Sequence, residues 1–98
     1  MIIAQLSIAP VGEGTSLSTY IQQVINVLEK EGVKYKTNPM ATIIETSNLS
    51  TLFTVVQKAH KAVLKEGAQR IITELKIDDR QDKNVTMETK LKSLSFSK

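Results

Sequence analysis

Polar side chains in three apolar stretches are the residues of this sequence best suited to chemistry. Gln5 and Ser7 fall in the first stretch, Glu45 in the second, and Glu74 and Lys76 in the third. Burying an unpaired neutral group costs about 1–3 kcal/mol, and burying a charge costs more. These side chains must therefore pair with one another, with water or with a ligand. The sequence leaves two interpretations open, an inter-subunit hydrogen-bond network and a ligand site.

Residues for the common kinds of active site are missing. The chain has no cysteine and one histidine, His60, which excludes cysteine nucleophiles and typical zinc or Ser-His sites. Gly12 and Gly14 follow the first stretch but match neither common phosphate-loop pattern. Lysines 58, 61 and 65 are typical of a solvated helix face, and the strand positions expected on the open side of the sheet carry no aromatic ring for stacking bases. We expect neither an enzyme, nor a metal site, nor a nucleic-acid partner.

Length and composition indicate one small folded domain spanning residues 1–98. The chain is 41% apolar and 23% charged, with a formal net charge of +3. A chain of this size buries only a thin core, which makes help from a second copy plausible. No basic segment opens the N-terminus and no stretch reaches the ~20 apolar residues of a membrane span. We expect a cytoplasmic protein that does not enter membranes.

The first half of the chain alternates between strand and helix patterns. Residues 2–9 alternate as a strand does, and apolar residues then recur at helical spacing over 17–31. Ser16 is the predicted N-cap of this helix, and Gly32 suits the left-handed position that closes it. Residues 33–37 form a short strand with exposed lysines, and Asn38-Pro39 makes a turn.

The second half repeats this order and adds a tail. Residues 40–46 are predicted as a strand, and Ser47 or Asn48 caps a second helix that ends at Gly67. A last strand covers about 69–77. Thr86 caps a short tail helix, which is too short to be stable unless it packs on something.

This βαββαβ order predicts an α+β fold of the ferredoxin-like kind. Such a sandwich has a four-stranded antiparallel sheet, strand order 4-1-3-2, with two helices on one face; the short C-terminal helix is additional. The residues expected to face the helices are Ile2, Leu6, Ile8, Ile44, Ile71, Leu75 and Ile77. The second face gathers Gln5, Ser7, Ile43, Glu45, Ile72, Glu74 and Lys76, and has no helix to cover it. Exposed apolar patches usually mark a partner, so we expect homo-oligomerisation through the sheet.

Three runs of residues together resemble the small thiamine-binding family of ferredoxin-like proteins. They are APVGEGTSLSTY at 9–20, PMATIIE at 39–45, and RIITELKIDDR at 70–80 followed by Asp82 and Lys83. The resemblance covers essentially the whole chain. Thr46 stands where the family pattern has glycine.

The resemblance implies binding of thiamine or its hydroxymethylpyrimidine part, without catalysis and without a cofactor, by dimers that pair into a tetramer. An aminopyrimidine presents a donor and acceptors in one plane, and Glu45 would accept from its exocyclic amine. The residues expected to bind the ligand are Gln5, Ser7, Ser16, Ser18, Thr42, Glu45 and Lys76. The contribution of each net hydrogen bond is about 0.5–1.5 kcal/mol, so we expect modest affinity.

Two other functions remain open at this point. In one, the chain is a regulatory or structural assembly module whose sheets meet without any small molecule. In the other, Glu45 is the general base of a small enzyme and lies in an apolar pocket. The sequence names no substrate for such an enzyme, nor does it say whether ligand binding would serve transport, storage or sensing.

Overall fold

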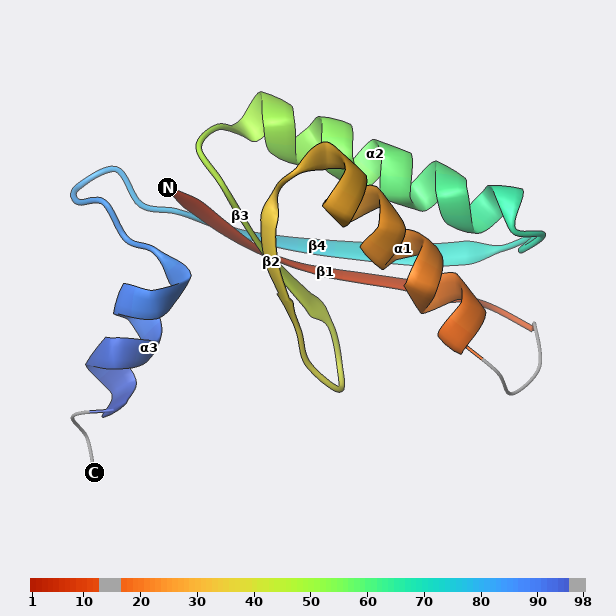
Figure 1. Ribbon diagram of the computed structural model, residues 1–98, viewed down its shortest axis with the longest axis horizontal. Coiled ribbons are helices and arrows are strands. Elements are labelled where there is room, and N and C mark those ends of the chain that lie inside the picture. Colours follow the sequence, from red (N-terminus) through yellow and green to blue (C-terminus); the bar gives the residue numbers. More distant parts are fainter. Residues whose placement is uncertain (13–16, 96–98) are drawn as a thin grey trace.

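The computed structural model describes residues 1–12 and 17–95 and confirms the predicted ferredoxin-like fold. Its elements are β1 (Ile2–Pro10), α1 (Ser18–Glu31), β2 (Lys34–Thr37), β3 (Thr42–Thr46), α2 (Leu49–Lys65), β4 (Ile71–Asp79) and α3 (Met87–Ser95). The strands form one antiparallel sheet in the order β2-β3-β1-β4, which is the predicted order counted from the other edge. Helices α1 and α2 lie on one side of the sheet, and α3 lies apart from them near the N-terminus (Figure 1). No helix within the described ranges is long and apolar enough to cross a membrane.

The helix ends follow local sequence signals. Gly32 adopts the left-handed conformation, φ 70°, directly after α1, as predicted. Asn48, not Ser47, caps α2, because its Oδ1 accepts a hydrogen bond from the Thr51 amide at 2.8 Å. Leu17 occupies the N-cap position of α1 without a side-chain hydrogen bond, and the predicted cap, Ser16, lies outside the described residues.

Two strands differ from their predicted ranges by two residues. The side chain of Asn38 accepts hydrogen bonds from the amides of Met40 and Ala41 at 2.8 and 2.7 Å, so these residues form a turn and β3 starts later. The last strand is 71–79 instead of 69–77, because Asp78 and Asp79 continue the pairing with β1 opposite Ile3 and Ile2. The charges of Asp78 and Asp79 predict a turn, whereas the long partner strand β1 extends the ladder through them.

The core lies between the sheet and the helices α1 and α2. Its largest fully buried side chains are Leu6, Leu28, Ile44, Leu52, Val55 and Val63. They come from two strands and both helices at the predicted spacings. Ile8, Ile71 and Leu75 pack against this cluster while partly exposed. Ile77, also predicted to face the helices, is exposed near the end of the edge strand.

One expectation about the second face is wrong: α3 covers part of it. Met87, the first residue of α3, is 4% exposed and lies close to Ile3 and Ile43 of the sheet. Thr86 caps this helix as predicted, because its Oγ1 accepts from the Thr89 amide at 3.2 Å. The remainder of the face stays open, with Ile72 48% exposed. The short tail helix thus obtains the packing that its length requires.

Candidate ligand-binding site

Two hollows in the described structure contain most of the residues predicted to bind a ligand. The first, here the edge hollow, lies between β1, the start of α1 and the turn at 38–41, and has a volume of about 200 Å³. The second, here the α3 hollow, lies between the second face and α3, and has a volume of about 430 Å³. The sequence predicted a single cluster of polar residues, whereas the fold divides them between these two places.

The edge hollow forms because β3 is shorter than β1. Pairing of the two strands stops at Leu6 opposite Thr42, while β1 continues to Pro10 along β4. Residues 7–9 of β1 therefore pair with β4 on one side only. On the side where β3 has ended, no described strand pairs with them. Peptide N–H and C=O groups left beside a strand in this way must find other partners. A planar ligand with a donor beside an acceptor is one such partner.

The walls of the edge hollow are apolar and its polar groups are few. Leu17, Ile21 and Val24 of α1 form one side, and Met40 from the turn is 86% exposed at its border. Thr42 is 8% exposed, and its side chain makes no hydrogen bond to any described residue. Thr37, which is opposite Thr42 across β2 and β3, gives the hollow a second hydroxyl group, and Ser7 borders it from β1. The described residues that line the hollow include no charged side chain.

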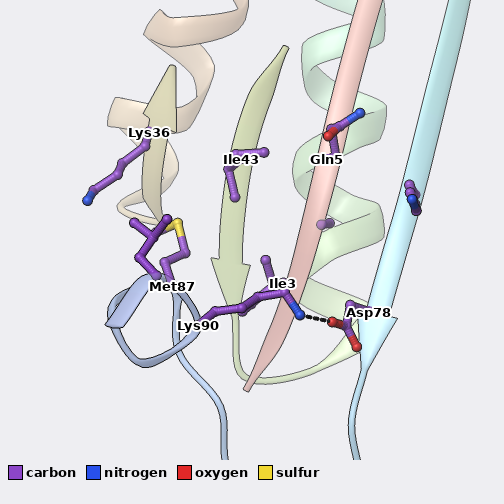
Figure 2. Close-up of a pocket in the computed structure, with 10 residues that line it drawn as sticks. Ile3, Gln5, Lys36, Ile43, Asp78, Met87 and Lys90 are labelled. Atoms are coloured by element: carbon purple, nitrogen blue, oxygen red, sulfur yellow. Dashed lines mark hydrogen bonds and ion pairs between the residues drawn. The ribbon is translucent and has the colours of Figure 1, made fainter. Parts of the chain in front are cut away.

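The α3 hollow is larger and is bordered by charges. Figure 2 shows Ile3, Gln5 and Ile43 along the sheet, with Met87 and Lys90 of α3 at one end. Gln5 pairs with Lys76 across β1 and β4, so these two predicted residues do lie together. Lysines 36, 76 and 90 and the carboxylate of Asp78 surround an apolar floor. This environment disfavours a cationic ring more than the edge hollow does.

Glu45 lines neither hollow. Its side chain is buried, with the residue 6% exposed, and its Oε1 accepts a hydrogen bond from the Met87 amide at 2.7 Å. Its Oε2 lies 4.0 Å from Nζ of Lys34, which is opposite Glu45 across β2 and β3. The carboxylate therefore satisfies the free amide at the start of α3 and adds a favourable charge to that helix end. This residue is predicted to bind a ligand and in the structure holds the tail helix.

Two ion pairs attach α3 to opposite edges of the sheet. Lys34 on β2 pairs with Glu88, and this hydrogen bond lowers the pKa of Glu88 and raises that of Lys34. Lys90 of α3 pairs with Asp78 on β4 at 2.5 Å (Figure 2), and the hydrogen bond lowers the pKa of Asp78. All four side chains are about half exposed, so each pair is weak and sensitive to salt.

Of the two remaining predicted residues, the structure describes one, at the start of α1. Ser18 is the first residue of that helix, next to Leu17 in the wall of the edge hollow. Ser16 lies outside the described residues. The structure thus brings Ser7 and Thr42 together with the region of Ser18, and keeps them apart from Gln5, Lys76 and Glu45.

Sequence reasoning missed Asn38 and the apolar wall. Asn38 lines the edge hollow and shapes the turn that borders it through two side-chain hydrogen bonds. Its position directly before Pro39 was the available signal, because asparagine side chains commonly accept from amides further along the chain. Leu17 and Ile21 were assigned to the core stripe of the first helix, yet both remain more than 40% exposed beside the hollow.

Comparison with known proteins gives consistent matches across the chain. The family model described as "Thiamine-binding protein" matches residues 4–95. The UPF0045 protein YqgV of Bacillus subtilis is 43% identical over 100 residues, which cover 97% of this chain and 95% of the relative. A UPF0045 protein of Methanothermobacter thermautotrophicus is 40% identical over 95 residues, 96% of each chain.

Solved structures share the fold. The crystal structure of a hypothetical protein of Methanocaldococcus jannaschii matches with a TM-score of 0.88 at 38% identity, over 96% of this chain and 95% of that one. A Thermotoga maritima protein described as a candidate for thiamine biosynthesis or salvage matches with a TM-score of 0.79 at 22% identity, over 95% and 97% of the two chains. At that identity the match concerns the fold alone. The family model spans nearly all of the described sequence, so this chain belongs to the thiamine-binding protein family.

Proposed function

We propose that this protein binds thiamine or its hydroxymethylpyrimidine part in the edge hollow, without catalysis, as a homo-oligomer in the cytoplasm. The observation that carries the proposal is the convergence of two of the family-like runs on this hollow. Described residues from the 9–20 run and from the 39–45 run line it together, although the runs lie far apart in the chain. Membership of the thiamine-binding family supports the same ligand class.

The polar groups of the hollow suit an aminopyrimidine ring. Such a ring carries an amine donor beside a ring-nitrogen acceptor, and the β1 edge over residues 7–9 offers peptide C=O and N–H groups in one plane. The hydroxyl groups of Thr37 and Thr42 can donate to or accept from the remaining ring positions. The flat faces of the ring would contact Leu17 and Ile21 on one side and the thioether of Met40 on the other.

The size of the hollow favours one ring. Sites for drug-sized ligands usually have roughly 300–1,000 Å³, and this hollow has about 200 Å³. The pyrimidine fits inside, and the thiazolium ring of thiamine would extend outward toward solvent. The positive charge of the thiazolium ring then needs no opposite charge inside the hollow. This agrees with the described residues that line the hollow, none of which is charged. A few hydrogen bonds and one buried ring support a dissociation constant in the micromolar range, which corresponds to a binding free energy of about 8 kcal/mol.

Several features favour binding without chemistry. His60 has its Nδ1 2.7 Å from Oγ1 of Thr73, far from the edge hollow, where it links α2 to β4. The described residues that line the hollow provide no ionisable group to act as acid or base.

Two further observations support the homo-oligomer and the cytoplasm in the proposal. The exposed apolar residues of the second face favour association of subunits through their sheets. The lack of cysteine agrees with a reducing compartment.

A structural assembly module is the second candidate, and the environment of Glu45 favours it. The buried carboxylate finds its partners, the Met87 amide and Lys34, within its own chain. No ligand is needed to compensate its burial. In this second candidate function, the polar residues of the sheet serve only to position α3 and to hold the subunits together.

Calorimetric titration with hydroxymethylpyrimidine and with thiamine distinguishes the two. We expect saturable binding near one ligand per chain, weakened threefold to tenfold in Thr42→Val, which removes a hydroxyl while keeping the shape. The matched control is Gln5→Leu in the α3 hollow, which should bind as the unaltered protein does. Binding lost in Gln5→Leu and kept in Thr42→Val would move the site to the α3 hollow. No heat with either compound at millimolar concentration would favour the assembly module.

A further inference from the structure

A row of four residues crosses the whole sheet in the α3 hollow. Lys36 of β2 is opposite Ile43 of β3, which is opposite Gln5 of β1. Gln5 is in turn opposite Lys76 of β4. All four residues line the hollow, and Figure 2 shows the first three side by side on neighbouring strands. The row therefore has a lysine at each end, with an apolar side chain and an amide side chain between them.

The two lysines of this row have no partner within the described chain. The next row of the sheet, which is attached to the first turn of α3, consists of Lys34, Glu45, Ile3 and Asp78. All three charged residues of that row contact α3. By contrast, Lys36 and Lys76 make no hydrogen bond or ion pair with any described residue. Their charges act on the carboxylates of Glu88 and Asp78, but each of these is hydrogen-bonded to a different lysine. Two ammonium groups are therefore left for a partner from outside.

Between the two lysines the hollow is apolar. Ile3 and Ile43 of the sheet form its floor, and Met87 and Leu91 of α3 border it. Leu91 is 55% exposed, so an apolar ligand would remove part of it from water. The volume of about 430 Å³ lies within the roughly 300–1,000 Å³ of small-molecule sites, which are mostly apolar with a few polar groups. The amide of Gln5 is such a polar group, because it both donates and accepts hydrogen bonds.

The charges around the hollow favour an anion with two acidic groups. Three lysines and one aspartate line it, and Lys90 pairs with that aspartate, Asp78. Lys36 and Lys76 therefore remain as two positive charges beside an apolar floor, a setting that attracts anions. Three strand spacings place the backbones of these two lysines about 14 Å apart. Their flexible four-carbon stems let the two amines approach opposite ends of a ligand one ring long. Glu74, two residues from Lys76 on β4, does not line the hollow.

We propose that the α3 hollow binds a small organic dianion, which has an apolar body and an acidic group at each end, as an aromatic dicarboxylate does. Its acidic groups pair with Lys36 and Lys76, and its ring lies on Ile43 beside Leu91 of α3. Gln5 donates a hydrogen bond from its amide to one acidic group. This ligand differs from the one in the proposed function, because thiamine is a cation and the described residues of the edge hollow carry no charge. The anion site therefore holds or fails independently of thiamine binding.

Calorimetric titration with terephthalate tests the site. This probe has a carboxylate at each end of a benzene ring, whereas benzoate has one carboxylate and sulfate has two charges without an apolar body. We expect one terephthalate per chain, bound about tenfold more tightly than either comparison compound, and more weakly as salt increases. Equal affinity for sulfate would indicate an adventitious ion only and would overturn the proposal. An absence of heat with terephthalate at millimolar concentration would overturn it as well.

Lysine variants locate the bound anion. Lys36→Met and Lys76→Met keep the apolar stem and remove the charge, so each should weaken terephthalate binding about threefold to tenfold. Both lysines are exposed, so the variants should fold. The matched control is Lys61→Met, which removes one positive charge from an exposed position of α2, on the other side of the sheet. We expect this control to bind terephthalate as the unaltered protein does. Equal weakening in all three variants would reflect net charge alone and would overturn the site.

Hydrogen exchange in α3 gives an independent readout. A ligand that contacts Leu91 should increase the protection of amides at residues 87–92, while amides that border the edge hollow keep theirs. Binding without this change would place the anion elsewhere and overturn the proposal. Lysine variants that alter the sedimentation of the protein but not the titration would show that the row contacts a second copy instead. A failed titration with thiamine beside a successful one with terephthalate would refute only the thiamine site.

Discussion

The carboxylate of Glu45 and the backbone amide of Met87 form a buried hydrogen bond of 2.7 Å between residues 42 positions apart. This bond joins β3 to the first turn of α3 and brings the tail helix onto the second face of the sheet. Lys34 lies beside it and pairs with Glu88 in the same turn. The most conspicuous carboxylate of the sequence therefore has a structural role in this chain.

Replacing Glu45 should release α3. Glu45→Ala leaves the Met87 amide without its acceptor, and we expect the free energy of unfolding to fall by about 1–3 kcal/mol. Glu45→Gln retains an oxygen acceptor and should lower the free energy of unfolding by a smaller amount. Urea denaturation measures the stability, and hydrogen exchange at residues 87–92 reports the position of α3. Equal stability of the alanine variant and the unaltered protein would contradict this role.

The attachment of α3 should depend on pH. The lowered pKa values of Asp78 and Glu88 mean that their ion pairs contribute fully above the ordinary carboxyl values near 4. That contribution is lost as the pH falls through the ordinary values toward the lowered ones. The raised pKa of Lys34 has the opposite sign, so its contribution is lost as the pH rises above about 10. The protection of α3 amides, their exchange rate relative to that of an unstructured chain at the same pH, should therefore be greatest between these limits.

The control for this pH response is the double variant Lys34→Met, Lys90→Met. It keeps the long apolar stems and removes the two cations that pair with α3 and with Asp78. We expect the protection of α3 amides to depend less on pH between pH 7 and 4 and to be less sensitive to salt. An unchanged acid response in this variant would show that other groups control the helix.

Asn38 should shape the edge hollow through its side chain. Asn38→Ala removes the acceptor of the Met40 and Ala41 amides, which lie 2.8 and 2.7 Å from Oδ1. We expect a destabilisation of about 1 kcal/mol and a several-fold loss of ligand affinity, since the turn borders the hollow. Asn38→Asp keeps the acceptor and is the matched control. Unaltered affinity in the alanine variant would separate the turn from the binding site.

Most of the fold follows from local patterns in the sequence. The alternation in residues 2–9 predicts β1, and the helical spacing from Leu17 predicts α1. The glycine at position 32 predicts where α1 ends. The strand order follows because βαββαβ chains with right-handed connections have few compact arrangements. These features depend on neighbouring residues, which a single sequence displays directly.

The distribution of the site residues could not be predicted in the same way. The bond of Glu45 to the start of α3 depends on where a distant tail packs, and no local pattern encodes that contact. The register of β1 and β3 places Thr42 opposite Leu6, on the helix side of the sheet. Gln5 is opposite Ile43 in the same register and therefore lies on the second face. The division into two hollows is thus a consequence of register and of the shorter β3.

The most direct test of ligand binding in the edge hollow is NMR mapping of amide shifts during titration with hydroxymethylpyrimidine. We expect saturable shifts at Ser7, Ala9 and Thr42 and at the start of α1, with little change at Gln5, Lys76 and Leu91. Shifts centred on the α3 hollow, or none at millimolar ligand, would contradict the account.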